Sequence, residues 1–249
     1  MPQKAASALR TSSARPGPSA KAAKSGKPAK PTKSAKSAKS AKPGTPGKPK
    51  APSKPSEVRI IGGEWKRTRL AVADKPGLRP TPDRVRETLF NWLASLAGVG
   101  GGLLPGWECV DAFAGTGALG LEAASRGAAN VLLCEQDAEL AAKLQAAKTK
   151  LSAEAVRIER GNGLTALERV PAGSLDAVFL DPPFESTALY EPSLRAAARA
   201  VRAGGSVYLE APRRWSDEEL AVFGLVGFRY LKAGAVHAHL LRPVSQGTA

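Results

Sequence analysis

The chain has 249 residues, with 37 Lys/Arg against 22 Asp/Glu, and its formal charge of +15 is unevenly distributed. Residues 1–56 contain 14 Lys/Arg and no Asp/Glu, which leaves residues 57–249 nearly neutral at +1. The sequence shows no secretory signal and no apolar run long enough to span a bilayer. Its two cysteines fall in expected buried strands, which favours a reducing compartment, so we expect a cytoplasmic protein.

Residues 1–56 form a Lys/Ala/Pro/Ser-rich basic tail, in which SAK occurs three times between 34 and 42. Such a segment buries too little apolar surface to offset the entropy of ordering, so we expect it to be disordered. Its lysines suit salt-dependent, sequence-independent contact with phosphates. A solubilising tail is the alternative. A transit peptide is disfavoured, because regular prolines would break an amphipathic helix.

Residues 57–106 are expected to form a small N-terminal extension. Two short strands at 58–61 and 68–72 make a hairpin, and a helix follows over 82–96. We expect Thr81 to cap this helix, with a proline at its first position.

From residue 107 onward, strands and helices alternate, which predicts a parallel sheet with helices on both faces. We expect strands at 107–112, 130–135, 156–159, 175–180 and 206–210, and a final hairpin of 228–232 with 236–241. We expect helices at 118–126, 138–151, 164–169, 190–202 and 216–222. Asp137 is predicted to cap the second of these helices, and Gly204-Gly205 to end the fourth.

Ligands of such sheets bind at the carboxyl ends of the strands. The first strand is followed by DAFAGTGALG (111–120), whose glycines match the G-x-G-x-x-G pattern of nicotinamide-dinucleotide sites. Glu135 lies 20 residues after Gly115 and can accept hydrogen bonds from a ribose diol. The Asp111 carboxylate would be repelled by a pyrophosphate but attracted to a cationic ligand. Asn162, after the third strand, can contact an adenine edge.

The fourth strand is followed by Asp181-Pro182-Pro183-Phe184. The Asp181 carboxylate and the Pro182 carbonyl are two acceptors for the two hydrogens of an exocyclic amine. Phe184 offers a face on which a base can stack. The group predicts methyl transfer to a nucleobase amine that has been drawn out of its stack.

No metal-ligand spacing occurs in the sequence, so we expect no metal. His237 and His239 alternate on a late strand and are interpreted as surface or packing residues.

DAFAGTGALG and DPPF resemble two motifs of amino-methylating class I S-adenosylmethionine-dependent methyltransferases. RIIGGEWKRTRL (59–70) and GLRPTPDRVRETLFNWL (77–93) are similar to the bacterial 16S rRNA guanine-N2 methyltransferase family, which modifies guanine 966. The resemblance covers about 57–243. It implies a Rossmann-like α/β fold with a mostly parallel seven-stranded sheet, S-adenosylmethionine as donor, a monomeric enzyme, and the assembling small ribosomal subunit as substrate.

The resemblance also implies roles for individual residues. The cofactor contacts would be Asp111, Phe113, Gly115, Gly117, Glu135 and Asn162 in the methyltransferase core, 107–249. Asp181, Pro182, Pro183 and Phe184 would hold the guanine. The RNA side would involve Arg59, Lys66, Arg67, Arg69, Arg79, Arg84 and Arg86.

Three alternatives remain at this point. DPPF serves any exocyclic amine, so an adenine-N6 DNA or RNA methyltransferase fits. The glycine pattern alone fits an NAD-dependent oxidoreductase. The basic tail alone fits a non-enzymatic nucleic-acid packaging protein.

Overall fold

The computed structural model describes residues 57–244 except 74, 76, 77 and 79. The predicted disorder of residues 1–56 therefore lies outside the described residues. In the described part of the chain, no helix is both long enough and apolar enough to cross a bilayer.

The N-terminal extension contains the expected hairpin and helix. Strand β1 (Glu57–Arg59) pairs antiparallel with β2 (Arg69–Ala71), and α1 (Asp83–Ala97) follows. The short 3-10 turn η1 (Gly100–Gly102) lies in the glycine-rich linker. The prediction that Thr81 caps α1 is wrong: Pro82 occupies the cap position, and no capping side chain accepts a hydrogen bond from the amides of the first turn. Thr81 is instead buried.

A seven-stranded sheet forms the centre of the domain, as predicted. Its strands are β3 (Glu108–Asp111), β4 (Asn130–Glu135), β5 (Val156–Arg160), β6 (Leu175–Leu180), β7 (Val201–Ala211), β8 (Leu225–Ala233) and β9 (Val236–Pro243). The strand order is β5-β4-β3-β6-β7-β9-β8. The first five strands are parallel, and β9 runs antiparallel to β7 and β8. The order reverses between β3 and β6, and this reversal marks the expected ligand site.

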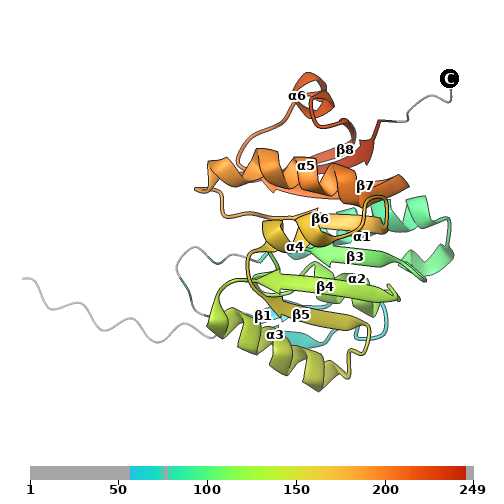
Figure 1. Ribbon diagram of the computed structural model, residues 1–249. Helices are drawn as coiled ribbons and strands as arrows, with labels where there is room; N and C mark the ends of the chain where they lie inside the picture. The colour runs from blue at the N-terminus through green and yellow to red at the C-terminus, as the bar shows by residue number, and fades with distance from the viewer. Residues whose placement is uncertain (1–56, 74, 76–77, 79, 245–249) are drawn as a thin grey trace, which may run out of the picture. The chain divides into compact units, whose positions relative to one another are not determined.

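Helices cover both faces of the sheet (Figure 1). Besides α1 they are α2 (Gly120–Ser125), α3 (Ala138–Leu151), α4 (Gly163–Arg169), the 3-10 turn η2 (Thr187–Leu189), α5 (Tyr190–Ala200) and α6 (Asp217–Ala221). Apolar residues of α1, α2 and α3 pack with one face of the sheet, whereas those of α4, α5 and α6 pack with the other. Side chains alternate between the two faces along each strand, so neighbouring residues of β6 serve different cores.

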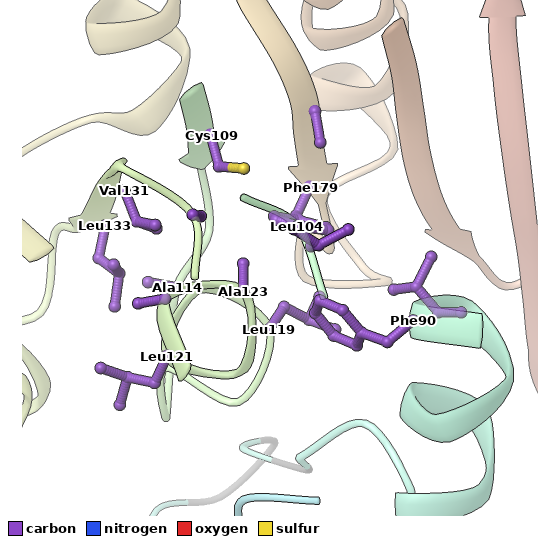
Figure 2. Close-up of a cluster of buried hydrophobic side chains, with 14 of the residues drawn as sticks. Phe90, Leu104, Cys109, Ala114, Leu119, Leu121, Ala123, Val131, Leu133 and Phe179 are labelled. Carbon is purple, nitrogen blue, oxygen red and sulfur yellow. The ribbon is translucent and has the colours of Figure 1, made fainter. Parts of the chain in front are cut away.

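The first core joins the N-terminal extension to the sheet. Figure 2 shows Phe90 of α1 near Phe179 of β6, with Leu119 and Leu121 of the α2 region and Leu133 of β4 in the same cluster. The Phe90 and Phe179 ring centroids lie 6.0 Å apart, within the usual range of an aromatic pair. Helix α1 is therefore held against the strands that carry the candidate site.

Two predicted helix ends can be compared directly. Asp137 caps α3 as expected, because its carboxylate accepts hydrogen bonds from the Glu139 and Leu140 amides. The fourth predicted helix ends early, at Ala200, and β7 begins at Val201, so Gly204-Gly205 is not its C-cap. A Cβ on Gly205 would lie 2.8 Å from the Asp176 carbonyl oxygen, so this glycine permits close approach of β7 to β6.

A buried carboxylate ties the hairpin to the core. Glu122 of α2 is fully buried and accepts hydrogen bonds from the amides of Ile61 (2.7 Å) and Gly62 (2.8 Å). It also accepts one from Arg126 Nε at 2.8 Å, and Arg86 Nη1 lies 3.5 Å away. The hairpin is therefore anchored by charge-assisted hydrogen bonds in addition to apolar packing.

Candidate active site

The structure brings the four predicted strand ends to one edge of the sheet. Strands β3, β4, β5 and β6 are parallel neighbours, so the residues after Asp111, Glu135, Arg160 and Leu180 emerge on the same side. The glycine loop (residues 112–119) follows β3, and Asp181–Phe184 follows β6, its neighbour across the reversal of strand order. The two groups that the sequence predicts to work together are thus adjacent.

Two carboxylates hold the glycine loop in place. Glu135 accepts a hydrogen bond from the Gly115 amide at 2.8 Å, and Asp111 accepts one from the Gly120 amide at 2.9 Å. Gly115 and Gly117 have positive φ angles of 51° and 77°, which L side chains rarely adopt. The loop therefore requires both its glycines and the acids at the ends of β3 and β4.

Asp111 carries an unsatisfied oxygen next to this loop. Its carboxyl group is buried, and Oδ1 makes no hydrogen bond of normal geometry within the described residues. Burial raises the Asp111 pKa to about 7, and the nearby charge of Glu135 adds to the rise. A cationic ligand would restore the charged form and complement the free oxygen. The site therefore fits a sulfonium-bearing or ammonium-bearing ligand better than a pyrophosphate.

Glu135 and Asn162 each have a local structural role. Besides Gly115, Glu135 accepts a hydrogen bond from the Asp137 amide at 2.8 Å. Asn162 caps α4, because its Oδ1 accepts a hydrogen bond from the Thr165 amide at 3.2 Å. A carboxylate has about four acceptor sites, and an amide nitrogen is a donor, so both side chains retain capacity for a ligand. Phe113, a predicted cofactor contact, is half-buried and packs against the core between the sheet and helices α4, α5 and α6.

The backbone at Gly163, just after β5, contacts the backbone at Ala112, just after β3. A Cβ at this position would lie 1.6 Å from the Ala112 carbonyl oxygen, so the two backbones touch. We expect Gly163→Ala to lower the free energy of unfolding by about 1–3 kcal/mol and to weaken cofactor affinity, because the backbone of the glycine loop must move. Chemical denaturation and calorimetric titration with S-adenosylmethionine measure the two effects.

Gly161→Ala is the matched control, because a Cβ at residue 161 would have no neighbouring atom within 4 Å. Equal loss in both variants would refute the role of the Gly163 contact.

Asp181–Phe184 begins where β6 ends. All six residues of β6 are buried, and the chain then turns, with the Ser186 amide donating to the Pro183 carbonyl at 2.8 Å. Pro182 is buried, whereas Asp181 and Phe184 are half-buried. Burial raises the Asp181 pKa well above its ordinary value, and the charges of Glu210 and Asp111 reinforce this shift.

Sequence reasoning missed several groups at this site. Glu210, near the end of β7, is buried and accepts a hydrogen bond from the Tyr208 hydroxyl at 2.9 Å. Burial raises the pKa of this carboxyl group, and the side chains of Thr81 and Tyr208 act against the rise. The buried Tyr190 hydroxyl has no partner within the described residues, and Asp181 and Glu210 act on its pKa, which burial raises to about 12. One signal was present in the sequence: Glu210 is a carboxylate closing an apolar strand, as Glu135 is.

The predicted RNA-side residues differ in exposure. Arg86 is fully buried, so its predicted contact with RNA is wrong; its guanidinium bonds to the Thr81 and Arg59 carbonyls at 3.1 and 2.9 Å. Arg59 and Arg69 are exposed and pair with Asp83 and Glu57. Lys66, Arg67 and Arg84 are exposed. Arg79 lies outside the described residues.

A groove on the protein surface includes two residues of the glycine loop. It lies between β2 and α3 and is lined by Leu70, Ala71, Val72, Ala73, Gly115, Thr116, Leu140, Lys143, Leu144, Ala146, Ala147 and Lys150. It contacts the candidate site only through Gly115 and Thr116. We therefore assign the chemistry to the strand ends, where the carboxylates gather.

Residues 58–241 match the family described as "Conserved hypothetical protein 95". The chain is 38% identical over 188 residues to "Ribosomal RNA small subunit methyltransferase D" of Escherichia coli (strain K12), covering 70% of this chain and 88% of that protein. It is 36% identical over 186 residues to the protein of the same name from Haemophilus influenzae, covering 70% and 92%. The solved structure titled "Putative methyltransferase yhhF from Escherichia coli" matches with a TM-score of 0.61 and 32% identity, over 77% of this chain and 100% of that one.

Proposed function

Since the chain belongs to the family described as Conserved hypothetical protein 95, we propose that it transfers a methyl group from S-adenosylmethionine to the N2 amine of a guanine in 16S rRNA, guanine 966, on the assembling small subunit. One observation carries the proposal: the glycine loop with its unsatisfied Asp111 oxygen lies beside Asp181–Phe184 at the reversal of strand order. The names of the similar proteins support the choice of ribosomal RNA.

On the donor side, S-adenosylmethionine supplies a methyl group activated by a positively charged sulfur. Asp111 and Glu135 would hold the cationic and ribose parts of this ligand, and their bonds to the Gly120 and Gly115 amides fix both carboxylates beside the glycine loop. The unsatisfied Asp111 oxygen and its raised pKa support this fit, since a cation lowers the pKa of a nearby carboxyl group.

On the acceptor side, the Asp181 carboxylate and the Pro182 carbonyl would each accept one hydrogen of the guanine amine. These bonds favour a tetrahedral nitrogen, which frees the lone pair for attack. Phe184 would stack on the extruded base, an interaction worth about 1–3 kcal/mol. The chain thus contributes mainly positioning and fixed charge.

A transfer assay tests the proposal. The full chain is incubated with labelled S-adenosylmethionine and small subunits from a strain that lacks the modification. We expect label on one guanine, at N2, after nuclease digestion. Label on adenine would favour the adenine-N6 alternative, and label only on DNA would refute the RNA substrate.

Equilibrium binding of the two cofactors distinguishes the methyltransferase proposal from the oxidoreductase alternative. We expect S-adenosylmethionine to bind and NADH not to bind at the same protein concentration. Tight NADH binding without S-adenosylmethionine binding would refute the methyltransferase proposal altogether.

The basic tail gives a further prediction. We expect a chain of residues 57–249 to bind RNA more weakly and with a shallower salt dependence than the full chain, because 14 Lys/Arg are removed. Each lost phosphate contact lowers the slope of log K against log salt by roughly 0.7–0.9. Filter binding between low and moderate salt measures the slope. Equal slopes for the two chains would mean that the tail does not contact RNA. We expect both the full chain and residues 57–249 to methylate the substrate.

A further inference from the structure

Glu210 lies next to Asp181 on the same face of the sheet. Parallel pairing aligns Phe179 with Tyr208 and Leu180 with Leu209, so the next positions along the two chains are Asp181 and Glu210. Side chains alternate along strands, which places both acids on the face that carries the Phe179 and Tyr208 rings. These rings pack edge to face, with centroids 6.5 Å apart.

Glu210 is fixed in orientation. It is 2% exposed, and the Tyr208 hydroxyl donates to its Oε1 at 2.9 Å. The Thr81 side chain also acts on the pKa of this carboxyl group and lowers it. Thr81 is itself held by Arg86, whose Nε donates to the Thr81 carbonyl at 3.1 Å. Thr81, expected to cap a helix, and Arg86, expected to contact RNA, are therefore bonded to each other, and Thr81 lies close enough to Glu210 to affect its pKa.

We propose that Glu210 is a positioning residue for Asp181: the two carboxyl groups form a partly buried pair that holds one proton, and the Tyr208 hydroxyl orients Glu210 within it. Two neighbouring carboxylates out of water repel each other, so one of them retains a proton. Burial raises the pKa of both carboxyl groups, and the charge of Glu210 adds to the rise at Asp181. The shared proton lies between the two groups, so the Asp181 oxygen that faces the amine remains an acceptor, and a further proton taken up there makes the pair neutral.

The catalytic use of this pair rests on the proposed function. When the guanine nitrogen gains the methyl group, the new nitrogen–carbon bond forms with the nitrogen lone pair, and the bonding pair of the old carbon–sulfur bond stays on sulfur. The nitrogen must then lose one proton. The singly protonated pair accepts it and becomes neutral, and the proton later leaves to water. A pair with one negative charge is a stronger acceptor here than an isolated, ordinary aspartate.

Other titratable groups also face the pair. Asp111 from β3 raises the pKa of Asp181, and Glu135 of β4 acts in turn on Asp111. Tyr190 from α5 and Tyr208 from β7 have pKa values raised by burial, so both hydroxyls remain protonated through the range in which the carboxyl groups titrate.

Carboxyl ¹³C NMR on the full chain, with Asp and Glu labelled at the side-chain carboxyl, tests the pair without any substrate. Asp181→Asn and Glu210→Gln assign the two resonances. We expect Glu210→Gln to lower the titration midpoint of Asp181 by about one pH unit or more, because a negative neighbour is removed. Thr81→Val, which keeps both acids, should raise the midpoint of Glu210. An unchanged Asp181 midpoint in Glu210→Gln overturns the proposal.

Asp176→Asn is the matched control. Asp176 is a buried carboxylate near the start of β6, at the opposite end of the sheet, where it accepts a hydrogen bond from the Glu108 amide at 2.8 Å and pairs with Arg202. This variant should leave both midpoints unchanged. A similar shift in Asp176→Asn would show a general effect of altered packing and would also overturn the proposal.

Steady-state kinetics of Glu210→Gln measure effects that a purely structural role of Glu210 would not produce. We expect Glu210→Gln to lower kcat about 10-fold or more, to shift the acidic limb of the pH profile to lower pH, and to leave KM for RNA within about two-fold. An unmoved acidic limb in an active variant contradicts the positioning role. If the wild-type chain methylates no guanine, the proposed function fails, while the NMR titration still decides whether the pair exists.

Discussion

Asp181→Ala should lose most methyl transfer and keep S-adenosylmethionine binding. Removal of one preorganised charged contact at a reacting centre costs about 100- to 1000-fold in kcat, and Asp181 is the carboxylate beside the proposed position of the amine. The donor side should be unaffected, because Asp111, Glu135 and the glycine loop are held by their own hydrogen bonds. Single-turnover transfer and calorimetric titration measure the two properties separately.

Glu185→Ala is the control, an exposed acid four residues later on the same loop. It should turn over at close to the wild-type rate. Wild-type turnover by Asp181→Ala would remove Asp181 from the mechanism, and loss of cofactor binding by this variant would place Asp181 on the donor side of the site.

The raised pKa of Asp181 has a consequence for the pH profile of the wild-type enzyme. In the proposed mechanism the Asp181 carboxyl group accepts a hydrogen bond from the amine, and burial raises its pKa. Transfer at saturating substrates should therefore rise with pH through a midpoint above the ordinary aspartate value and then reach a plateau. A profile already flat across the acidic range would contradict an Asp181 carboxylate with a raised pKa.

Glu122→Ala should destabilise the domain by about 3–5 kcal/mol, the range observed when one partner of a buried ion pair is removed. The substitution leaves the Ile61 and Gly62 amides without their acceptor. It also leaves Arg126 and Arg86 without their buried carboxylate, with side chains 6% and 0% exposed. Urea unfolding measures the loss, and hydrogen exchange should show it first in the hairpin of β1 and β2.

Glu64→Ala serves as its control, because Glu64 is an exposed acid in the same hairpin. We expect a change within about 0.5 kcal/mol for this surface position. A loss below about 1 kcal/mol in Glu122→Ala would mean that apolar packing alone holds the extension on the core.

The parts of the fold that were predicted well have strong local signals. Strands β4 and β6 have the predicted bounds, and so does helix α3, because each combines a continuous apolar pattern with a clear start or stop. The end of α5 was predicted two residues too late. A Gly-Gly pair normally ends a helix, but here Gly205 serves the close packing of β7 against β6, a requirement set by another strand.

Arg86 and Thr81, near the site, were also predicted wrongly because distant parts of the chain determine their contacts. Both have residue types and local spacing that predict other roles, a phosphate contact and a helix cap. Their surroundings depend on residues far along the chain: Arg86 donates to the Arg59 carbonyl, 27 residues away, and Thr81 acts on the pKa of Glu210, which follows it by more than a hundred residues. Sequence spacing holds no information on such contacts until the strands are paired.

By itself, the sequence determined the class of fold and the two halves of the candidate site. Hydrophobic periodicity is a local property, and DAFAGTGALG and DPPF each lie within a short continuous stretch whose residue types already define a chemistry. Only the tertiary structure decided which carboxyl groups act on one another. Asp111 lies in β3, Asp181 directly follows β6, and Glu210 lies in β7. Burial raises the pKa of all three, and repulsion from neighbouring carboxylates adds to the rise at Asp111 and Asp181, which happens only once these strands lie side by side.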